Sequence, residues 1–67
     1  MTSYDPVTSV MRSLDLLEAL NRQRYTTVQQ LYRQTGLPKP TIVRLLETLM
    51  AAGYVSRDTS GKGYQVT

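Results

Sequence analysis

Apolar residues recur at helical spacing in three stretches of the chain. In the first stretch, residues 10–23, they follow one another at three- and four-residue steps: Val10, Leu14, Leu17 and Leu20. This pattern predicts an amphipathic helix whose buried side carries these apolar residues. We expect Thr8 or Ser9 to cap this helix. Residues 1–7 have no periodicity and are expected to form a flexible lead-in.

The second stretch begins with a capping-box motif, Thr27-Val28-Gln29-Gln30. In this motif the Thr side chain accepts a hydrogen bond from the third helical N–H, and the Gln side chain reaches back to the cap. Gly36 is expected to end the helix, because glycine takes the left-handed conformation without a Cβ penalty. Leu37 precedes Pro38 and is pushed toward extended geometry, so its side chain should fill the space between the second and third helices. The buried side of the second helix is expected to carry Val28, Leu31 and Tyr32.

The third stretch, about residues 39–52, has the strongest helical pattern. Proline has a φ angle that suits a first helical turn, so the helix is expected to start between Pro38 and Pro40. One narrow apolar stripe follows: Ile42, Leu45, Leu46 and Leu49. The opposite face carries Arg44 and Glu47, which we expect to pair with each other within the helix.

After the third helix, two strand-like segments at 54–57 and 63–67 flank a run of turn-forming residues. An isolated hairpin is marginal in water, so its apolar residues should pack against the helices: Val55, Tyr64 and Val66. Three tyrosines stand where core packing is expected: Tyr32, Tyr54 and Tyr64. The expected fold is mainly α with a small β-hairpin, a winged helix-turn-helix over residues 8–67 whose two-stranded wing covers about residues 54–67.

The composition excludes several classes of function. A chain of 67 residues has room for one domain, and it contains no Cys and no His. Thiolate metal ligands and the commonest general base are therefore missing, so we expect neither an enzyme nor a cofactor. No run of about 18 apolar residues and no signal-peptide pattern occurs, which predicts a cytoplasmic protein with no membrane partner. Eight Lys and Arg against five Asp and Glu give a net charge of +3, which suits a polyanionic partner.

The start of the third helix is the main candidate surface for DNA. Lys39, Thr41 and Arg44 lie there beside unpaired N–H groups and the positive end of the helix dipole. Arg44 can bridge O6 and N7 of guanine, and Thr41 can bond a phosphate or a base. The alternative is an ordinary solvated helix face. Arg57 and Lys62 of the hairpin form a second candidate surface for the adjacent backbone or minor groove, with a merely soluble turn as its alternative.

Three stretches resemble the N-terminal DNA-binding domain of the IclR family of bacterial transcriptional regulators: VMRSLDLLEAL, LYRQTGLPKPTIVRLLETLMAAGYV and GYQVT. The resemblance implies a dimeric winged helix-turn-helix that binds a roughly palindromic double-stranded operator. It also implies a small-molecule effector, bound by a separate C-terminal domain outside these residues. Operator contacts carry over to Lys39, Thr41 and Arg44. Pro40 belongs to the same expected contact surface but departs from the family pattern, which more usually has a small or hydroxylated residue there.

A homodimer has some support in the first helix, where Met11 and Leu16 lie outside the apolar stripe and would otherwise be exposed. A broad core face is the alternative. The function that these patterns favour is sequence-specific DNA binding for transcriptional regulation. The competing hypothesis is a winged-helix module for protein–protein interaction or dimerisation without DNA binding, which would present an apolar patch through Val43 and Met50.

Overall fold

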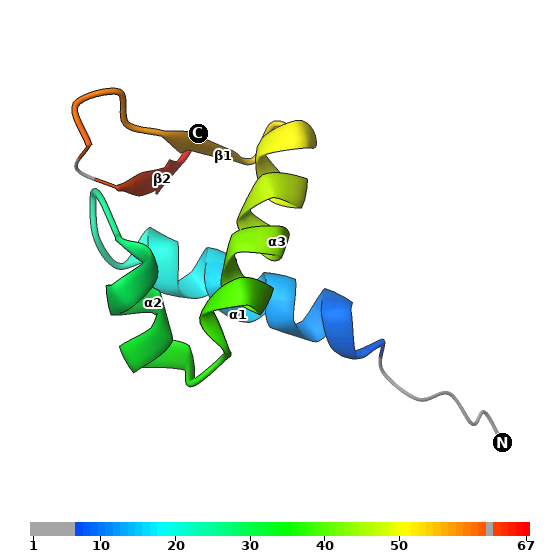
Figure 1. Ribbon diagram of the computed structural model, residues 1–67. Coiled ribbons are helices and arrows are strands. Elements are labelled where there is room, and N and C mark those ends of the chain that lie inside the picture. Colours follow the sequence, from blue (N-terminus) through cyan, green and yellow to red (C-terminus); the bar gives the residue numbers. More distant parts are fainter. Residues whose placement is uncertain (1–6, 62) are drawn as a thin grey trace, which may run out of the picture.

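A computed structural model describes residues 7–61 and 63–67 of the chain. The chain forms five elements in this order: α1 (Thr8–Asn21), α2 (Val28–Thr35), α3 (Lys39–Ala51), β1 (Val55–Arg57) and β2 (Tyr64–Val66). Figure 1 shows α1 running across the molecule, α3 crossing it, and the antiparallel hairpin beginning at the C-terminal end of α3. The predicted winged helix-turn-helix is confirmed. Most of the expected lead-in, residues 1–6, and Lys62 lie outside the described residues.

One small core joins the three helices and β1. Its buried apolar residues are Leu16, Ala19, Leu20, Leu31, Ile42, Leu46, Leu49 and Val55. Half-buried side chains from the three helices, from the turn before α3 and from β2 pack around it: Leu17, Val28, Leu37, Leu45, Met50, Tyr64 and Val66. The apolar stripe predicted for α3 is therefore confirmed, and so is the inward position of Leu37. None of the helices in the described part of the chain is long and apolar enough to span a bilayer.

The buried side of α1 differs from the prediction. Leu16 is fully buried, whereas Val10 and Leu14 are 53% and 54% exposed. The cause is visible in Figure 1, where the N-terminal half of α1 extends past α3 and away from the other elements. The predicted stripe assumed that every turn of the helix is packed. Only the second half is, and there Leu16, Ala19 and Leu20 face the core.

The predicted cap of α1 is also wrong. The helix already includes Thr8, so Val7 is the N-cap residue, and no side chain caps the helix. The Val7 carbonyl accepts hydrogen bonds from the N–H groups of Val10 and Met11, at 3.0 and 3.1 Å. Among the described residues, these main-chain bonds take the place of a side-chain cap at the start of α1.

Two of the three tyrosines expected in the core are exposed. Tyr54 is 60% exposed, because neighbouring residues of an extended chain point to opposite sides and Val55 points inward. Tyr32 is 44% exposed, because the short helix α2 buries only the narrow side on which Leu31 lies. Tyr64 is half-buried against the core, as expected.

The turn between α2 and α3 is built as the sequence predicts. At the start of α2, the Gln30 N–H donates to Thr27 Oγ1 at 3.1 Å, and the Thr27 N–H donates to Gln30 Oε1 at 2.9 Å. At its end, Gly36 has a φ of 73°. The Leu37 N–H then donates to Thr35 Oγ1 at 3.2 Å. These bonds fix the direction in which the chain leaves α2, and therefore the angle at which α3 stands.

The wing is fastened to the connection between α1 and α2. The Thr26 N–H donates to the Tyr64 carbonyl at 2.9 Å, and the Tyr64 N–H donates to the Thr26 carbonyl at 2.8 Å. Strand β2 therefore lies between β1, where Tyr64 pairs with Arg57, and residue 26. The approach is close, since a Cβ atom on Gly63 would lie 2.6 Å from the Thr26 carbonyl oxygen. This contact is tertiary and was not predicted from the sequence.

We predict that Gly63→Ala lowers the free energy of unfolding by about 2–3 kcal/mol. The added methyl group meets the Thr26 main chain, and the residue must also keep a φ of 127°. Gly61→Ala is the matched control, because Gly61 has a φ of 85° but nothing within 4 Å of the added Cβ. It should lose only about 1 kcal/mol, the cost of a left-handed alanine. Urea denaturation of both variants measures this difference. Equal losses would show that the close approach of Gly63 to the Thr26 main chain does not limit stability.

Candidate nucleic-acid interface

The start of α3 presents fewer main-chain donors than an ordinary helix. The first N–H within the helix to find a helical acceptor is that of Ile42, which donates to the Pro38 carbonyl at 3.0 Å. Pro38 is the N-cap residue and Pro40 is in the first turn, so neither offers an N–H. Only the Lys39 and Thr41 N–H groups are left at this end. This end of α3 therefore offers a ligand mainly side chains rather than main-chain amides.

Four of the predicted contact residues lie together at this end of α3. Lys39, Pro40 and Arg44 are exposed, and Thr41 is half-buried. The Lys39 ammonium lies 5.5 Å from the centre of the Tyr32 ring, within the range of a cation–π contact. Tyr32 of α2 thus holds a cation at the first residue of α3, a role that the sequence pattern did not suggest.

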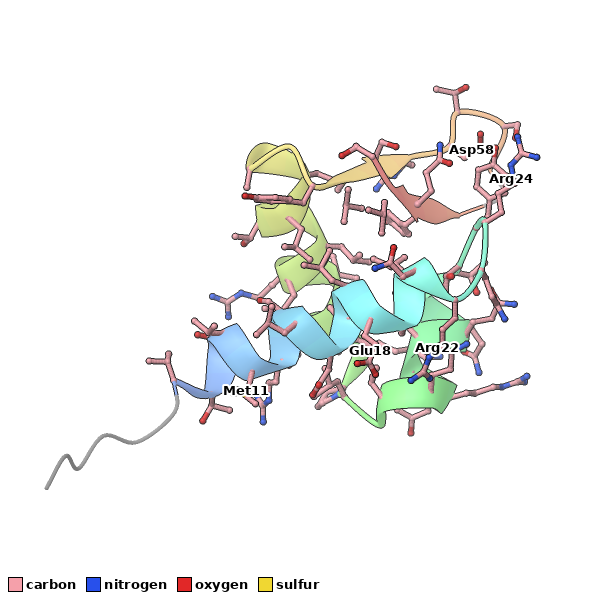
Figure 2. All side chains as sticks on the ribbon, turned by 180° about the vertical axis from the view of Figure 1, so that it is seen from behind. Met11, Glu18, Arg22, Arg24 and Asp58 are labelled. Atoms are coloured by element: carbon pink, nitrogen blue, oxygen red, sulfur yellow. The ribbon has the colours of Figure 1, made fainter. Side chains whose placement is uncertain are left out.

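The expected ion pair between Arg44 and Glu47 is absent. Among residues 7–61 and 63–67, the ion pair that forms joins Glu18 of α1 to Arg22, the residue after the end of that helix, at 2.8 Å and i,i+4 spacing. Figure 2 shows these two side chains lying against each other. Arg44 instead lines a groove between α3 and α1, together with Thr41 and Arg12. The Glu47 carboxylate is therefore exposed on the outer face of α3, without an ion-pair partner among the described residues.

The wing residues form a separate group. The Arg57 guanidinium donates to Tyr64 Oη at 3.2 Å and lies 5.5 Å from the centre of the same ring. The hairpin begins at the C-terminal end of α3, and Lys39 lies at the opposite end of that helix. A helix of 13 residues is about 20 Å long, so the structure does not bring Arg57 close to the start of α3. Lys62 lies outside the described residues.

Sequence reasoning missed two cations. Arg12 of α1 lines the same groove as Arg44, because the first half of α1 extends past α3. Arg24, which lies 5.5 Å from the centre of the Tyr25 ring, sits at the wing end of the molecule, where Figure 2 also places Asp58. No local pattern could have found either position, since both follow from the way that distant elements meet.

Comparison with known proteins identifies the family of this domain. Residues 9–59 match the IclR helix-turn-helix domain. The chain belongs to the IclR family. It is 30% identical over 63 residues to the HTH-type transcriptional regulator KdgR of Dickeya chrysanthemi, covering 94% of this chain and 21% of that protein. It is 34% identical over 53 residues to the HTH-type transcriptional regulator KipR of Bacillus subtilis, covering 79% of this chain and 21% of that protein.

A solved structure supports the same assignment. The crystal structure of an IclR family transcriptional regulator from Brucella abortus has a TM-score of 0.85 and 35% sequence identity, over 92% of this chain and 24% of that one. The chain thus spans about a quarter or less of the proteins that it matches. The helix-turn-helix match and the names of these relatives favour DNA binding for transcriptional regulation. The relatives are regulators rather than enzymes, and the alternative of an interaction module without DNA binding is not favoured.

We predict that Glu47→Gln strengthens DNA binding. The unpaired carboxylate repels phosphate, so its removal should raise affinity about twofold to fivefold, equivalent to roughly 0.4–1 kcal/mol for an exposed charge. The gain should be similar for operator and scrambled duplexes, because the effect is electrostatic. Asp15→Asn on α1 is the control with the same change in charge, and fluorescence anisotropy at low salt is the measurement. An equal gain in both variants would mean that net charge alone is responsible.

Proposed function

We propose that this IclR-family domain binds double-stranded operator DNA with α3 in the major groove and with Arg44 as its main base-reading residue. The observation that carries this proposal is the state of Arg44, an exposed guanidinium without an ion-pair partner among the described residues, in the first half of an exposed helix face. Such a guanidinium can bind DNA without first breaking an ion pair within the protein. Its two parallel N–H donors match the acceptors O6 and N7 of guanine.

The other predicted residues take supporting roles in this proposal. Lys39 binds a phosphate, with its ammonium kept near the start of α3 by the Tyr32 ring. Thr41 contacts a base or a phosphate, and Pro40 fills the surface between them without donating a hydrogen bond. Arg57 and Lys62 of the wing contact the neighbouring backbone or minor groove.

We further propose that the protein acts as a homodimer, but not on the residues first expected. Leu16 is fully buried in the core and leaves only Met11 of the original pair. Met11 belongs to an exposed apolar stripe at i, i+3, i+4 and i+7 spacing along the first half of α1: Val7, Val10, Met11 and Leu14. Pairing of this stripe would cover an apolar surface that is otherwise open to water. The two recognition helices would then meet half-sites about one DNA turn, or a multiple of it, apart.

Two further parts of the proposal concern the protein as a whole. A small-molecule effector would bind through a C-terminal domain that lies outside these residues. The cytoplasmic location expected from the sequence stays a prediction, which suits a regulator that must reach DNA.

We predict that Arg44→Ala relaxes the base preference of the domain. Sites are first selected from random duplexes with the unaltered chain, and binding to selected and scrambled duplexes is then compared by anisotropy. Loss of the guanine contact should reduce the difference in binding free energy between selected and scrambled duplexes by about 1–3 kcal/mol. Lys39→Ala is the contrasting variant, because loss of a phosphate contact should weaken both duplexes alike. An Arg44→Ala variant that keeps the full preference would refute the assignment of this residue.

We predict that Met11→Glu weakens dimerisation. A carboxylate buried in an apolar interface loses its hydration, so the dissociation constant of the dimer should rise about tenfold or more, or roughly 1.4 kcal/mol. Tyr54→Glu places the same charge on another exposed apolar residue and should leave the dimer unchanged. Sedimentation equilibrium measures both. A chain that stays monomeric at every concentration, or variants that behave alike, would count against this interface.

A further inference from the structure

A groove of about 520 Å³ runs between the first half of α1 and the outer side of α3. Both helices contribute four residues to its walls: Ser9, Val10, Arg12, Ser13, Thr41, Arg44, Leu45 and Thr48. The groove exists because α1 extends past α3, as Figure 1 shows. On its α1 wall, Val10 belongs to the apolar stripe proposed for the dimer, whereas Ser9, Arg12 and Ser13 have no place in the function proposed so far.

The charges that line this groove have one sign. Arg12 and Arg44 come from opposite walls, and no carboxylate lines it. Among the described residues neither guanidinium has an ion-pair partner. The next groove, between α1 and α2, is different, since Asp15 and Glu18 line it and Glu18 pairs with Arg22. Two unpaired guanidinium groups facing one solvent-filled groove favour an anionic ligand with several acceptor oxygens.

Two of the four hydroxyl groups that line the groove already donate a hydrogen bond within the protein. Ser13 Oγ donates to the Ser9 carbonyl at 2.8 Å, and Thr48 Oγ1 donates to the Arg44 carbonyl at 3.0 Å, so both protons are already used. The hydroxyls of Ser9 and Thr41 make no such bond within the described part of the chain. The donors left to a ligand are therefore the two guanidinium groups and these two hydroxyls. This set matches a phosphodiester, whose two non-bridging oxygens share one negative charge and which needs no acceptor from the protein.

We propose that Arg12 of α1 binds a backbone phosphate of the same duplex whose bases Arg44 contacts, so that one DNA strand is held between α1 and α3. The inference rests on the proposed function, because it assumes that the outer side of α3 faces the duplex. It adds a division of labour: Arg44 reads a base, and Arg12 neutralises a neighbouring phosphate from the other wall. The contact carries affinity and orientation but no sequence information.

The first test compares the salt dependence of binding by the 67-residue chain and its Arg12→Gln variant. Each phosphate neutralised on B-DNA contributes about 0.9 to the slope of log K against log salt. The magnitude of this slope should be smaller by about 0.9 in the variant. Its affinity should fall by a similar factor on selected and scrambled duplexes. Arg22→Gln removes the same charge from the residue that follows the end of α1, in the groove with Asp15 and Glu18, and should leave the slope unchanged.

The second test locates the phosphate. Methylphosphonate linkages, which carry no charge, replace the phosphates of the selected duplex one at a time. The unaltered chain should lose affinity at several positions, and one of these losses should vanish in Arg12→Gln while the others stay.

The outcomes separate this inference from the function on which it rests. If the unaltered chain shows no DNA binding at low salt, the proposed function fails and the inference falls with it. If the chain binds DNA but Arg12→Gln keeps both the slope and the methylphosphonate profile, only the inference is overturned. The same holds if Arg12→Gln shifts the dimer equilibrium in sedimentation and leaves the slope intact, because the groove would then be a subunit contact.

Discussion

The packing of one narrow stripe of α3 against the second half of α1 decides what the rest of the molecule can present. Ile42 and Leu46 are fully buried, and they meet Leu16 and Leu20 in the core. Because the stripe is narrow, the remaining circumference of α3 is free to face a ligand. Because it meets only the second half of α1, the first half extends beyond the core. The exposed side of α3, the groove and the apolar stripe of α1 all follow from this one arrangement.

Local features were predictable from the sequence because they depend on neighbouring residues alone. The capping box at Thr27, the left-handed Gly36 and the apolar stripe of α3 each have their whole cause within a few residues. The same reasoning failed for α1, where the spacing of apolar residues could not reveal which turns have a neighbour. It also failed for Tyr32 and Tyr54. Each lies next to a buried residue, but that position does not tell whether the tyrosine side chain points to the core or to solvent.

The candidate site was predictable to a similar degree. Lys39, Thr41 and Arg44 share one helix end, so their proximity needed only the helical repeat. The presence of Arg12 beside Arg44 needed the crossing of two helices, which no periodicity contains. The expected pair of Arg44 and Glu47 shows the converse error, since i,i+3 spacing permits an ion pair but exposed side chains gain little from forming one.

The two main-chain hydrogen bonds between Thr26 and Tyr64 have a consequence for the order in which the domain forms. The two residues belong to opposite halves of the chain, so these bonds close a long loop and need the helices between them to be in place. On a ribosome the three helices leave the exit tunnel before β2 does, because β2 follows them in the chain. The reading helix therefore exists, in a loosely held form, before the strand that completes the fold has been synthesised. The fold of the domain is therefore complete only after β2 has been synthesised.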